Sequence, residues 1–336
     1  MDAVNTGIST REHGGKLEQA SRKFARPLEE WIDLSTGINP LPYPVRTVSE
    51  HSWSRLPEQG AYDALCDAAS RYLGCPSREV MAIAPGTQSL IQVLPHMRSY
   101  SRVGVVSPTY NEHAHAWKEA GHDVVEITEL EDAGKDVDVV VIVNPNNPDG
   151  RTWSRETLLT VADELASRGG WLVVDEAFCD VTPGISIASC AGRPGLVILR
   201  SFGKFFGLAG IRLGLVLAAP GFCDLLRRRL GPWAIAGPAL EIGERAYADD
   251  AWIAEARKRL EDDRKRLSGL LERSGGNVIG GTDLFLLVRF ANASAVFEEL
   301  AQAGILVRNF SYCASWLRFG LPGREDAWVR LEKALP

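Results

Sequence analysis

Several patterns that would point to a function are missing from the 336-residue sequence. No run approaches the ~20 apolar residues that cross a bilayer. The first segment, which carries Asp2, Arg11 and Glu12, lacks the apolar core of a secretory signal. The six cysteines form no C-x-x-C pair, so the common zinc and redox motifs are excluded. His113 and His115 would share one face of a strand, but no cysteine or carboxylate cluster lies near them, so we expect no metal site. Without an export signal, we expect free thiols in a reducing cytoplasm.

Sequence signatures of nucleotide and nucleic-acid binding are also missing. No G-x-G-x-x-G opens a helix after a strand, and Phe205 follows Gly203 and Lys204 where a P-loop requires Ser or Thr. The chain has 37 Lys+Arg against 43 Asp+Glu, a net charge of −6, and no basic stripe. Hydrophobic residues make up 45% and charged residues 24%, which excludes a disordered or collagen-like chain. The class that fits is a soluble globular protein with a small-molecule site.

Short apolar runs alternate with amphipathic segments through the middle of the chain. Residues 61–73 and 154–168 place apolar side chains at helical spacing. The runs suited to buried strands are Val103–Val106, Val137–Val143, Trp171–Val174, Leu196–Leu199 and Leu213–Leu217. This rhythm predicts a mostly parallel sheet with helices on both faces.

The composition and the periodicity of apolar residues divide the chain into three parts. Residues 1–45 are dense in Gly, Pro and Asn and predict an irregular arm. Residues 46–230 carry the alternating pattern and predict a large α/β domain. Residues 231–336 predict a smaller α+β domain. Its expected elements are a long helix rich in charged residues at 252–274, strands at 284–290 and 305–308, and a last helix at 325–334.

Polar side chains follow successive apolar runs, at the ends of the predicted strands. Asn147 follows the run that ends at residue 143, Asp175 follows the next, and Lys204 and Arg212 follow the one after. Ligands of open parallel sheets bind at the carboxyl ends of the strands, so these side chains would converge on one site. Each alone has an ordinary alternative: a turn for the asparagine, a helix cap or ion pair for the aspartate, and a surface position for the lysine.

Together, the order and spacing of these residues resemble the fold-type I pyridoxal-phosphate enzymes, the aspartate aminotransferase superfamily. The motifs that carry the resemblance span most of the chain: Ala84-Pro85-Gly86-Thr87-Gln88, Pro108-Thr109-Tyr110, the Asn147 loop, Asp175, Ser201-x-x-Lys204 and Arg212. The resemblance implies the fold-type I PLP-dependent transferase fold, in which a large, mostly parallel α/β/α domain joins a smaller α+β domain. It also implies pyridoxal 5'-phosphate as cofactor and a homodimer.

The resemblance assigns roles in cofactor binding and catalysis to these residues. Lys204 would form a Schiff base with the cofactor aldehyde, which a desolvated lysine of lowered pKa favours. Asp175 would keep the ring nitrogen protonated, and Asn147 would hydrogen-bond the ring hydroxyl. Tyr110 would stack on the ring face, with plain core packing as the alternative. The phosphate would be bound by backbone N–H groups at a helix start and by two side chains: Gly86, Thr87 and Gln88, with Ser201 and Arg212.

Two positions depart from the usual pattern of the superfamily. Phe178 stands where many aminotransferases have a tyrosine that donates to the ring oxygen, and phenylalanine cannot donate. Leu56 stands near the place where a neighbouring subunit often contributes a phosphate-binding tyrosine. Tyr62 is the candidate replacement for that second tyrosine.

The N-terminal arm and the lysine loop resemble one subfamily in particular. His13-Gly14-Gly15, residues 31–40, Trp53-x-Arg55-Leu56-Pro57 and residues 201–210 look like the threonine-phosphate decarboxylases of cobalamin synthesis. An arm that merely covers a dimer interface is the alternative. The resemblance implies decarboxylation of L-threonine O-3-phosphate to (R)-1-amino-2-propanol O-2-phosphate. Such a carbon–carbon lyase acts on a small phosphorylated amino acid and needs neither nucleic acid nor membrane.

The resemblance also nominates residues for the substrate. Arg318 resembles the carboxylate-binding arginine of the family, and Arg308 and His13 are candidates for the substrate phosphate, because a guanidinium suits a dianion. Asn147 would face the substrate too. Solvated charges at a strand edge are the alternative for both arginines. A clamped phosphate would turn the carboxylate out of the ring plane, and Lys204 or a water would return a proton after CO₂ leaves. A histidinol-phosphate-type aminotransferase is the first alternative function, and a non-catalytic binding protein of this fold is the second.

Overall fold

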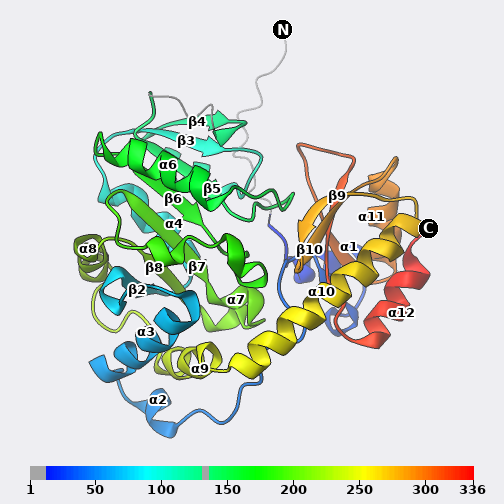
Figure 1. Cartoon of the computed structure of the whole chain (residues 1–336). Coiled ribbons are helices and arrows are strands. Elements are labelled where there is room, and N and C mark those ends of the chain that lie inside the picture. The colour runs from blue at the N-terminus through cyan, green and yellow to red at the C-terminus, as the bar shows by residue number, and fades with distance from the viewer. Residues whose placement is uncertain (1–12, 131–135) are drawn as a thin grey trace.

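A computed structural model describes residues 13–130 and 136–336, and its fold is built on two β-sheets (Figure 1). The residues on which we excluded an export signal, Asp2, Arg11 and Glu12, lie outside the described part of the chain. Among the described residues, no helix combines the length and hydropathy that a membrane crossing requires.

The larger sheet has seven strands in the order β2-β8-β7-β6-β5-β3-β4. Five neighbouring strands run parallel, whereas β8 is antiparallel to both β2 and β7. This arrangement confirms the predicted mostly parallel sheet. The strands are β2 (Met81–Ala84), β3 (Arg102–Val106), β4 (Asp123–Ile127), β5 (Val139–Val143), β6 (Trp171–Asp175), β7 (Leu196–Ser201) and β8 (Gly214–Leu217).

Helices cover both faces of this sheet and bury its central strands completely. Val140 and Ile142 of β5 belong to one hydrophobic core, whereas Val139 and Val141 belong to the core on the opposite face. Alternate side chains of a strand point to opposite faces, so an unbroken valine–isoleucine run forms a strand that is buried on both sides. The helices around this sheet are α2 (Glu50–Ser54), α3 (Gln59–Leu73), α4 (Thr87–Val93), α5 (Glu112–Glu119), α6 (Arg155–Ala166), α7 (Phe202–Phe205), α8 (Pro220–Leu230) and α9 (Gly237–Tyr247).

The second sheet has five strands in the order β1-β11-β12-β10-β9, and the long helix α10 runs diagonally toward it from α9 (Figure 1). Its strands are β1 (Ile32–Leu34), β9 (Asn277–Thr282), β10 (Phe285–Arg289), β11 (Ile305–Asn309) and β12 (Trp316–Gly320). The associated helices are α1 (Leu17–Phe24), α10 (Asp250–Arg273), α11 (Ala293–Gln302) and α12 (Glu325–Ala334).

The N-terminal arm is more regular than the sequence predicts. It contains α1, and its strand β1 pairs in parallel with β11, so a segment near residue 33 is an edge strand of the second sheet. A three-residue strand is too short to show an alternating pattern, and its partner lies more than 270 residues away in the chain. The expectation of an irregular arm was therefore wrong for these residues.

A buried ion cluster fixes the ends of the two central strands β6 and β7. The Arg200 guanidinium is 3% exposed; it donates to Glu176 Oε2 at 2.7 Å and also to Asp180. Glu176 follows Asp175 at the end of β6, and Arg200 precedes Ser201 at the end of β7. The ion pairs therefore hold together the two strand ends that carry predicted site residues.

Replacement of Arg200 by methionine is expected to lower the free energy of unfolding by about 3–5 kcal/mol, because two carboxylates would remain buried without their cation. Arg193→Met is the matched control, since Arg193 pairs with Asp163 on the surface and such pairs contribute about 1 kcal/mol or less. Urea unfolding followed by circular dichroism measures both. Equal losses in the two variants would contradict the structural role given to the buried cluster.

Candidate active site

A cavity of about 190 Å³ opens where β5, β6 and β7 end. It is lined by every residue that the sequence nominated for the cofactor: Gly86, Thr87, Gln88, Tyr110, Asn147, Asp175, Ser201, Lys204 and Arg212. Asp175 and Ser201 are the last residues of β6 and β7, and the others lie in the segments that follow β2, β3, β5 and β7 or precede β8. The sheet thus brings together residues up to 126 positions apart. Their individual roles stay predictions.

Asp175 lies at the last position of β6 and is 3% exposed. Its Oδ1 accepts a hydrogen bond from the Ala177 amide at 3.0 Å, and its Oδ2 lies 2.8 Å from Nε2 of the buried His113. A buried carboxylate needs such partners. The remaining space around Asp175 faces the cavity, where it can interact with a protonated ring nitrogen.

His113 is the functional neighbour that sequence reasoning missed. We expected His113 and His115 on one face of a strand, but both lie on helix α5. Two positions apart on a helix, side chains point about 200° from each other. His113 therefore faces Asp175, whereas His115 pairs with Glu119 at the surface. Within the described ranges, no group of three His, Cys, Asp or Glu residues is arranged to hold a metal ion.

Lys204 lies in α7 and reaches the cavity beside Phe178, whose ring centroid is 5.5 Å from Nζ. Burial and the positive charge of Arg318 lower the pKa of the Lys204 amine and Asp175 opposes them, so that the pKa falls to about 8. A larger fraction of the amine is therefore neutral near neutral pH than in an exposed lysine. A neutral amine is the form that attacks a carbonyl carbon.

Gly86 and Arg212 approach each other at the start of α4. The φ angle of Gly86 is +81°, and a Cβ at this position would lie 2.7 Å from Arg212 Nη2. Glycine is therefore required both for the backbone conformation and for the space. Arg212 itself adopts φ +53°, an uncommon conformation for a side-chain-bearing residue, and donates to the Ala209 carbonyl at 2.9 Å. The result is a notch between Gly86 and the Arg212 guanidinium at the start of α4.

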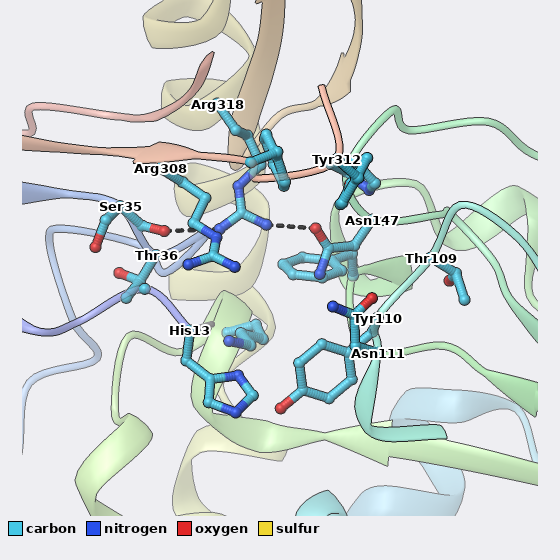
Figure 2. Close-up of a pocket in the computed structure, with 15 residues that line it drawn as sticks. His13, Ser35, Thr36, Thr109, Tyr110, Asn111, Asn147, Arg308, Tyr312 and Arg318 are labelled. Atoms are coloured by element: carbon cyan, nitrogen blue, oxygen red, sulfur yellow. Dashed lines mark hydrogen bonds between the residues drawn. The ribbon is translucent and has the colours of Figure 1, made fainter. Parts of the chain in front are cut away.

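A second cavity, of about 180 Å³, adjoins the first (Figure 2). The two share Tyr110, Asn147, Phe178 and Lys204 as lining residues. The second cavity is also lined by the residues nominated for the substrate: His13, Asn147, Arg308 and Arg318. Figure 2 shows the two guanidinium groups on one side of this cavity, with His13 and Tyr110 opposite them.

The two arginines stand at paired positions of the second sheet. Arg308 of β11 lies directly opposite Arg318 of β12, and like charges in such a pair repel each other. Arg318 is 7% exposed, so the alternative of a solvated strand-edge charge was wrong for this residue. Burial and the charge of Arg308 together lower its pKa to about 10. An anion bound between the two guanidinium groups would relieve both burial and repulsion.

Arg318 joins three distant segments through neutral acceptors. Its Nη1 donates to Asn147 Oδ1, and its Nη2 donates to the Ser35 carbonyl at 2.7 Å (Figure 2). The buried Nε has no hydrogen-bond partner among the described residues. Because Arg318 occupies the amide oxygen of Asn147, the Nδ2 group of that amide is the part available to a ligand in the cavity.

Ser35, which accepts a hydrogen bond from Arg318, also attaches the N-terminal arm beside the second cavity. The Gly15 amide donates to Ser35 Oγ at 2.7 Å, and Ser35 Oγ donates to Asp33 at 2.6 Å. A Cβ on Gly14 would lie 2.3 Å from the Ser35 carbonyl oxygen, so glycine is needed for this approach. The contact brings His13 over the cavity, with its ring centroid 6.1 Å from that of Tyr110.

The two departures from the superfamily pattern fall in different places. Phe178 forms part of the wall of both cavities and packs edge-on against Phe285, with ring centroids 5.0 Å apart. Leu56 and Tyr62 instead line a separate groove of about 800 Å³. The Tyr62 hydroxyl accepts from the Ile235 amide at 3.4 Å. Within one chain, Tyr62 therefore does not reach the cofactor cavity as the replacement we considered.

The comparison with models of protein families identifies the family of this chain. The model for "aminotransferase class I and II" matches residues 29–331, which include both sheets and every site residue except His13. The chain belongs to this family. The resemblance inferred from the sequence motifs is thus confirmed, as is the fold class.

Two curated relatives carry the same name. The threonine-phosphate decarboxylase of Pseudomonas aeruginosa is 47% identical over 96% of this chain and 97% of its own length. The threonine-phosphate decarboxylase of a Sinorhizobium species is 40% identical over the same shares. A histidinol-phosphate aminotransferase of Aeromonas hydrophila is 28% identical over 95% of this chain and 94% of its own. Within the family, this chain groups with the threonine-phosphate decarboxylases.

Solved structures agree on the fold. Histidinol-phosphate aminotransferase from Sinorhizobium meliloti, solved in complex with pyridoxal-5'-phosphate, has a TM-score of 0.81 at 22% identity and covers 98% of both chains. L-threonine-O-3-phosphate decarboxylase from Porphyromonas gingivalis has a TM-score of 0.73 at 21% identity, covering 90% of this chain and 97% of the other. At these identities the likeness establishes the fold alone.

The lowered pKa of Lys204 predicts how the reactivity of its amine depends on pH. Acylation of Lys204 by acetic anhydride, followed by peptide mass spectrometry, should titrate with a midpoint near pH 8. Arg318→Met should raise this midpoint, because it removes a positive charge that lowers the pKa. The exposed Lys265, whose pKa is raised by its hydrogen bond to Glu261, is the control within the same digest. A Lys204 midpoint as high as that of Lys265 would contradict the assignment.

Proposed function

We propose that this protein is a pyridoxal-phosphate-dependent enzyme that decarboxylates L-threonine O-3-phosphate to (R)-1-amino-2-propanol O-2-phosphate for cobalamin biosynthesis. The relatives at 47% and 40% identity support this activity. The observation that carries it is the pair of opposed arginines, Arg308 and Arg318, on the wall of a cavity that adjoins Lys204.

We also propose that the protein is located in the cytoplasm, since all six cysteines are free.

The residues of the first cavity fit pyridoxal phosphate. Lys204 presents an amine of lowered pKa to an aldehyde, and Asp175 presents a buried carboxylate to a ring nitrogen. The amide Nδ2 of Asn147 can donate to a ring hydroxyl because Arg318 occupies its oxygen. The notch between Gly86 and Arg212 suits the phosphate, which accepts from backbone N–H groups and a guanidinium. When bound, the cofactor takes up the electron pair of the bond that breaks at the substrate α-carbon.

The second cavity fits the two anionic groups of threonine phosphate. Arg308 and His13 would bind the phosphate dianion, and the Arg318 guanidinium would bind the carboxylate. Both anions would offset the repulsion between the two arginines. A substrate without the phosphate would offset less of this repulsion.

The orientation of the substrate selects the reaction. The bond that breaks is the one held perpendicular to the cofactor ring, so a phosphate fixed at Arg308 leaves the carboxylate at Arg318 as the departing group. The carbon–carbon bond breaks, CO₂ leaves, and a proton must then be added to the α-carbon. Lys204, with a pKa of about 8, is placed to hold that proton and deliver it. Phe178 offers no competing donor on this side of the cavity.

A direct assay tests the proposed function. Purified protein supplied with pyridoxal phosphate and threonine phosphate should release CO₂ and aminopropanol phosphate in equal amounts. Lys204→Ala should lose at least about 10³-fold of the rate, together with the absorbance of the lysine-bound cofactor. The surface variant Lys265→Ala is the control and should keep both.

The same assay separates the alternative functions. Accumulation of pyridoxamine phosphate, with amino transfer to a 2-oxo acid and no CO₂, would replace the decarboxylase by a histidinol-phosphate-type aminotransferase. Failure of the wild-type protein to develop the absorbance of a lysine-bound cofactor would reject the cofactor assignment and favour a binding protein of the same fold.

We also propose that the protein is a homodimer. Trp53, Leu56 and Trp233 are large apolar residues with 71%, 63% and 56% of their surface exposed. Leu56 and Trp233 line the groove of about 800 Å³. Exposed apolar surface of this kind, gathered around a groove, is typical of an interface between protein chains.

A pair of substitutions tests the dimer. Wild-type protein should sediment at twice the mass of one chain, whereas Leu56→Glu combined with Trp233→Glu should sediment as a monomer, because it places two charges on the apolar surface. Tyr100→Glu is the control, since Tyr100 is 75% exposed and lies outside the groove. Sedimentation velocity measures all three. A wild-type monomer would reject the proposal.

A further inference from the structure

One acidic side chain lies among the groups that would bind anions. Glu112 is 2% exposed in the first turn of α5. A carboxylate is favourable near a helix N-terminus, but this does not account for its burial beside residues of two cavities that would receive phosphates. A buried charge requires partners, and two partners of Glu112, Gln88 and His13, are site residues.

Glu112 connects three segments of the chain. Its Oε2 accepts from Gln88 Nε2 at 2.7 Å, and its Oε1 lies 3.2 Å from His13 Nε2. Gln88 Oε1 in turn accepts from the Tyr110 hydroxyl at 3.2 Å. The Oε1–Nε2 approach is an ion-pair distance, and it places the His13 imidazole next to a buried carboxylate at the edge of the second cavity.

We propose that Glu112 is a positioning residue for substrate recognition, which holds the His13 imidazole so that the N-terminal arm closes the phosphate end of the second cavity. This inference rests on the proposed function, since it takes the substrate phosphate as the group that His13 meets. Glu112 acts through His13 and touches neither substrate nor cofactor itself.

Among the described residues, the backbone of the arm is attached at Gly15, two positions beyond His13. The bond from Gly15 to Ser35 fixes the chain path, but the His13 side chain is 37% exposed and would rotate freely without its contact to Glu112. A side chain that must be ordered during binding costs about 0.5–1.5 kcal/mol of affinity. By ordering His13 before the substrate arrives, Glu112 removes this cost and directs the imidazole toward the cavity.

Glu112→Gln tests the inference, because glutamine has the same shape and can still accept from Gln88. We expect KM for threonine phosphate to rise about tenfold and kcat to change by less than about twofold, since binding is weakened equally in the ground state and the transition state. In His13→Gln, the further change Glu112→Gln should have no additional effect on KM. The control is Glu119→Gln, which removes the partner of the exposed His115 from the same helix and should leave both constants unchanged.

A spectroscopic measurement tests the same contact without turnover. In protein labelled with ¹⁵N-histidine, the His13 imidazole signals are identified as those that disappear in His13→Gln. Glu112→Gln should shift these signals and leave those of His113 in place. If Glu112→Gln does not fold, Glu112→Asp gives the same test, because its shorter side chain also withdraws the carboxylate from His13. Unchanged His13 signals in the folded variant would overturn the inference.

The remaining outcomes are also decisive. An unchanged KM in Glu112→Gln would overturn the inference, and so would a loss of cofactor absorbance with KM unaffected at saturating cofactor, because Glu112 would then act through Gln88 instead. If the wild-type protein does not release CO₂ from threonine phosphate, the proposed function fails, whereas the ¹⁵N measurement still decides whether Glu112 positions His13.

Discussion

The hydrogen bonds of Arg318 hold three segments of the chain together at the site. A buried guanidinium must be hydrogen-bonded, and Arg318 finds its acceptors in the Asn147 loop of the large sheet and in Ser35 of the arm. The same charge lowers the pKa of Lys204. One arginine of β12 therefore orients the amide of Asn147, anchors the arm and adjusts the reactivity of the lysine. The separation of the two sheets is bridged where the chemistry would occur.

Much of the large sheet could be predicted because its central strands are buried on both faces. A run such as Val139–Val143 has few alternatives to a buried strand, and the prediction of residues 137–143 differs from the structure by two positions. The strand ends then indicate the site, since Asp175 directly follows one predicted strand and Lys204 lies five positions beyond the end of the next. Neither the prediction of the buried strands nor the placement of site residues at their ends required knowledge of tertiary contacts. The roles beyond this placement came from the resemblance to a family.

The parts that could not be predicted depend on contacts between distant residues. Strand β4 at Asp123–Ile127 is only partly buried and mixes polar with apolar residues, so its pattern is weak. Strand β1 exists because it pairs with β11 at the other end of the chain. His113 was placed on a strand because two histidines at alternate positions suit a period of two. Its true partner, Asp175, is 62 positions away, and no local pattern reveals that distance.

Helix α5 shows how a chain of net charge −6 can build an anion site. Its neighbouring residues Glu112 and His113 each contact a residue that lines a different cavity: Glu112 contacts His13, and His113 contacts Asp175. The carboxylates of Glu112 and Asp175 thus lie beside imidazoles, whereas Arg308 and Arg318 stand opposite each other on neighbouring strands of the second sheet. Because like charges repel across β11 and β12, a dianion bound between the two guanidinium groups would reduce this repulsion. The site can therefore favour an anion although the chain as a whole is acidic.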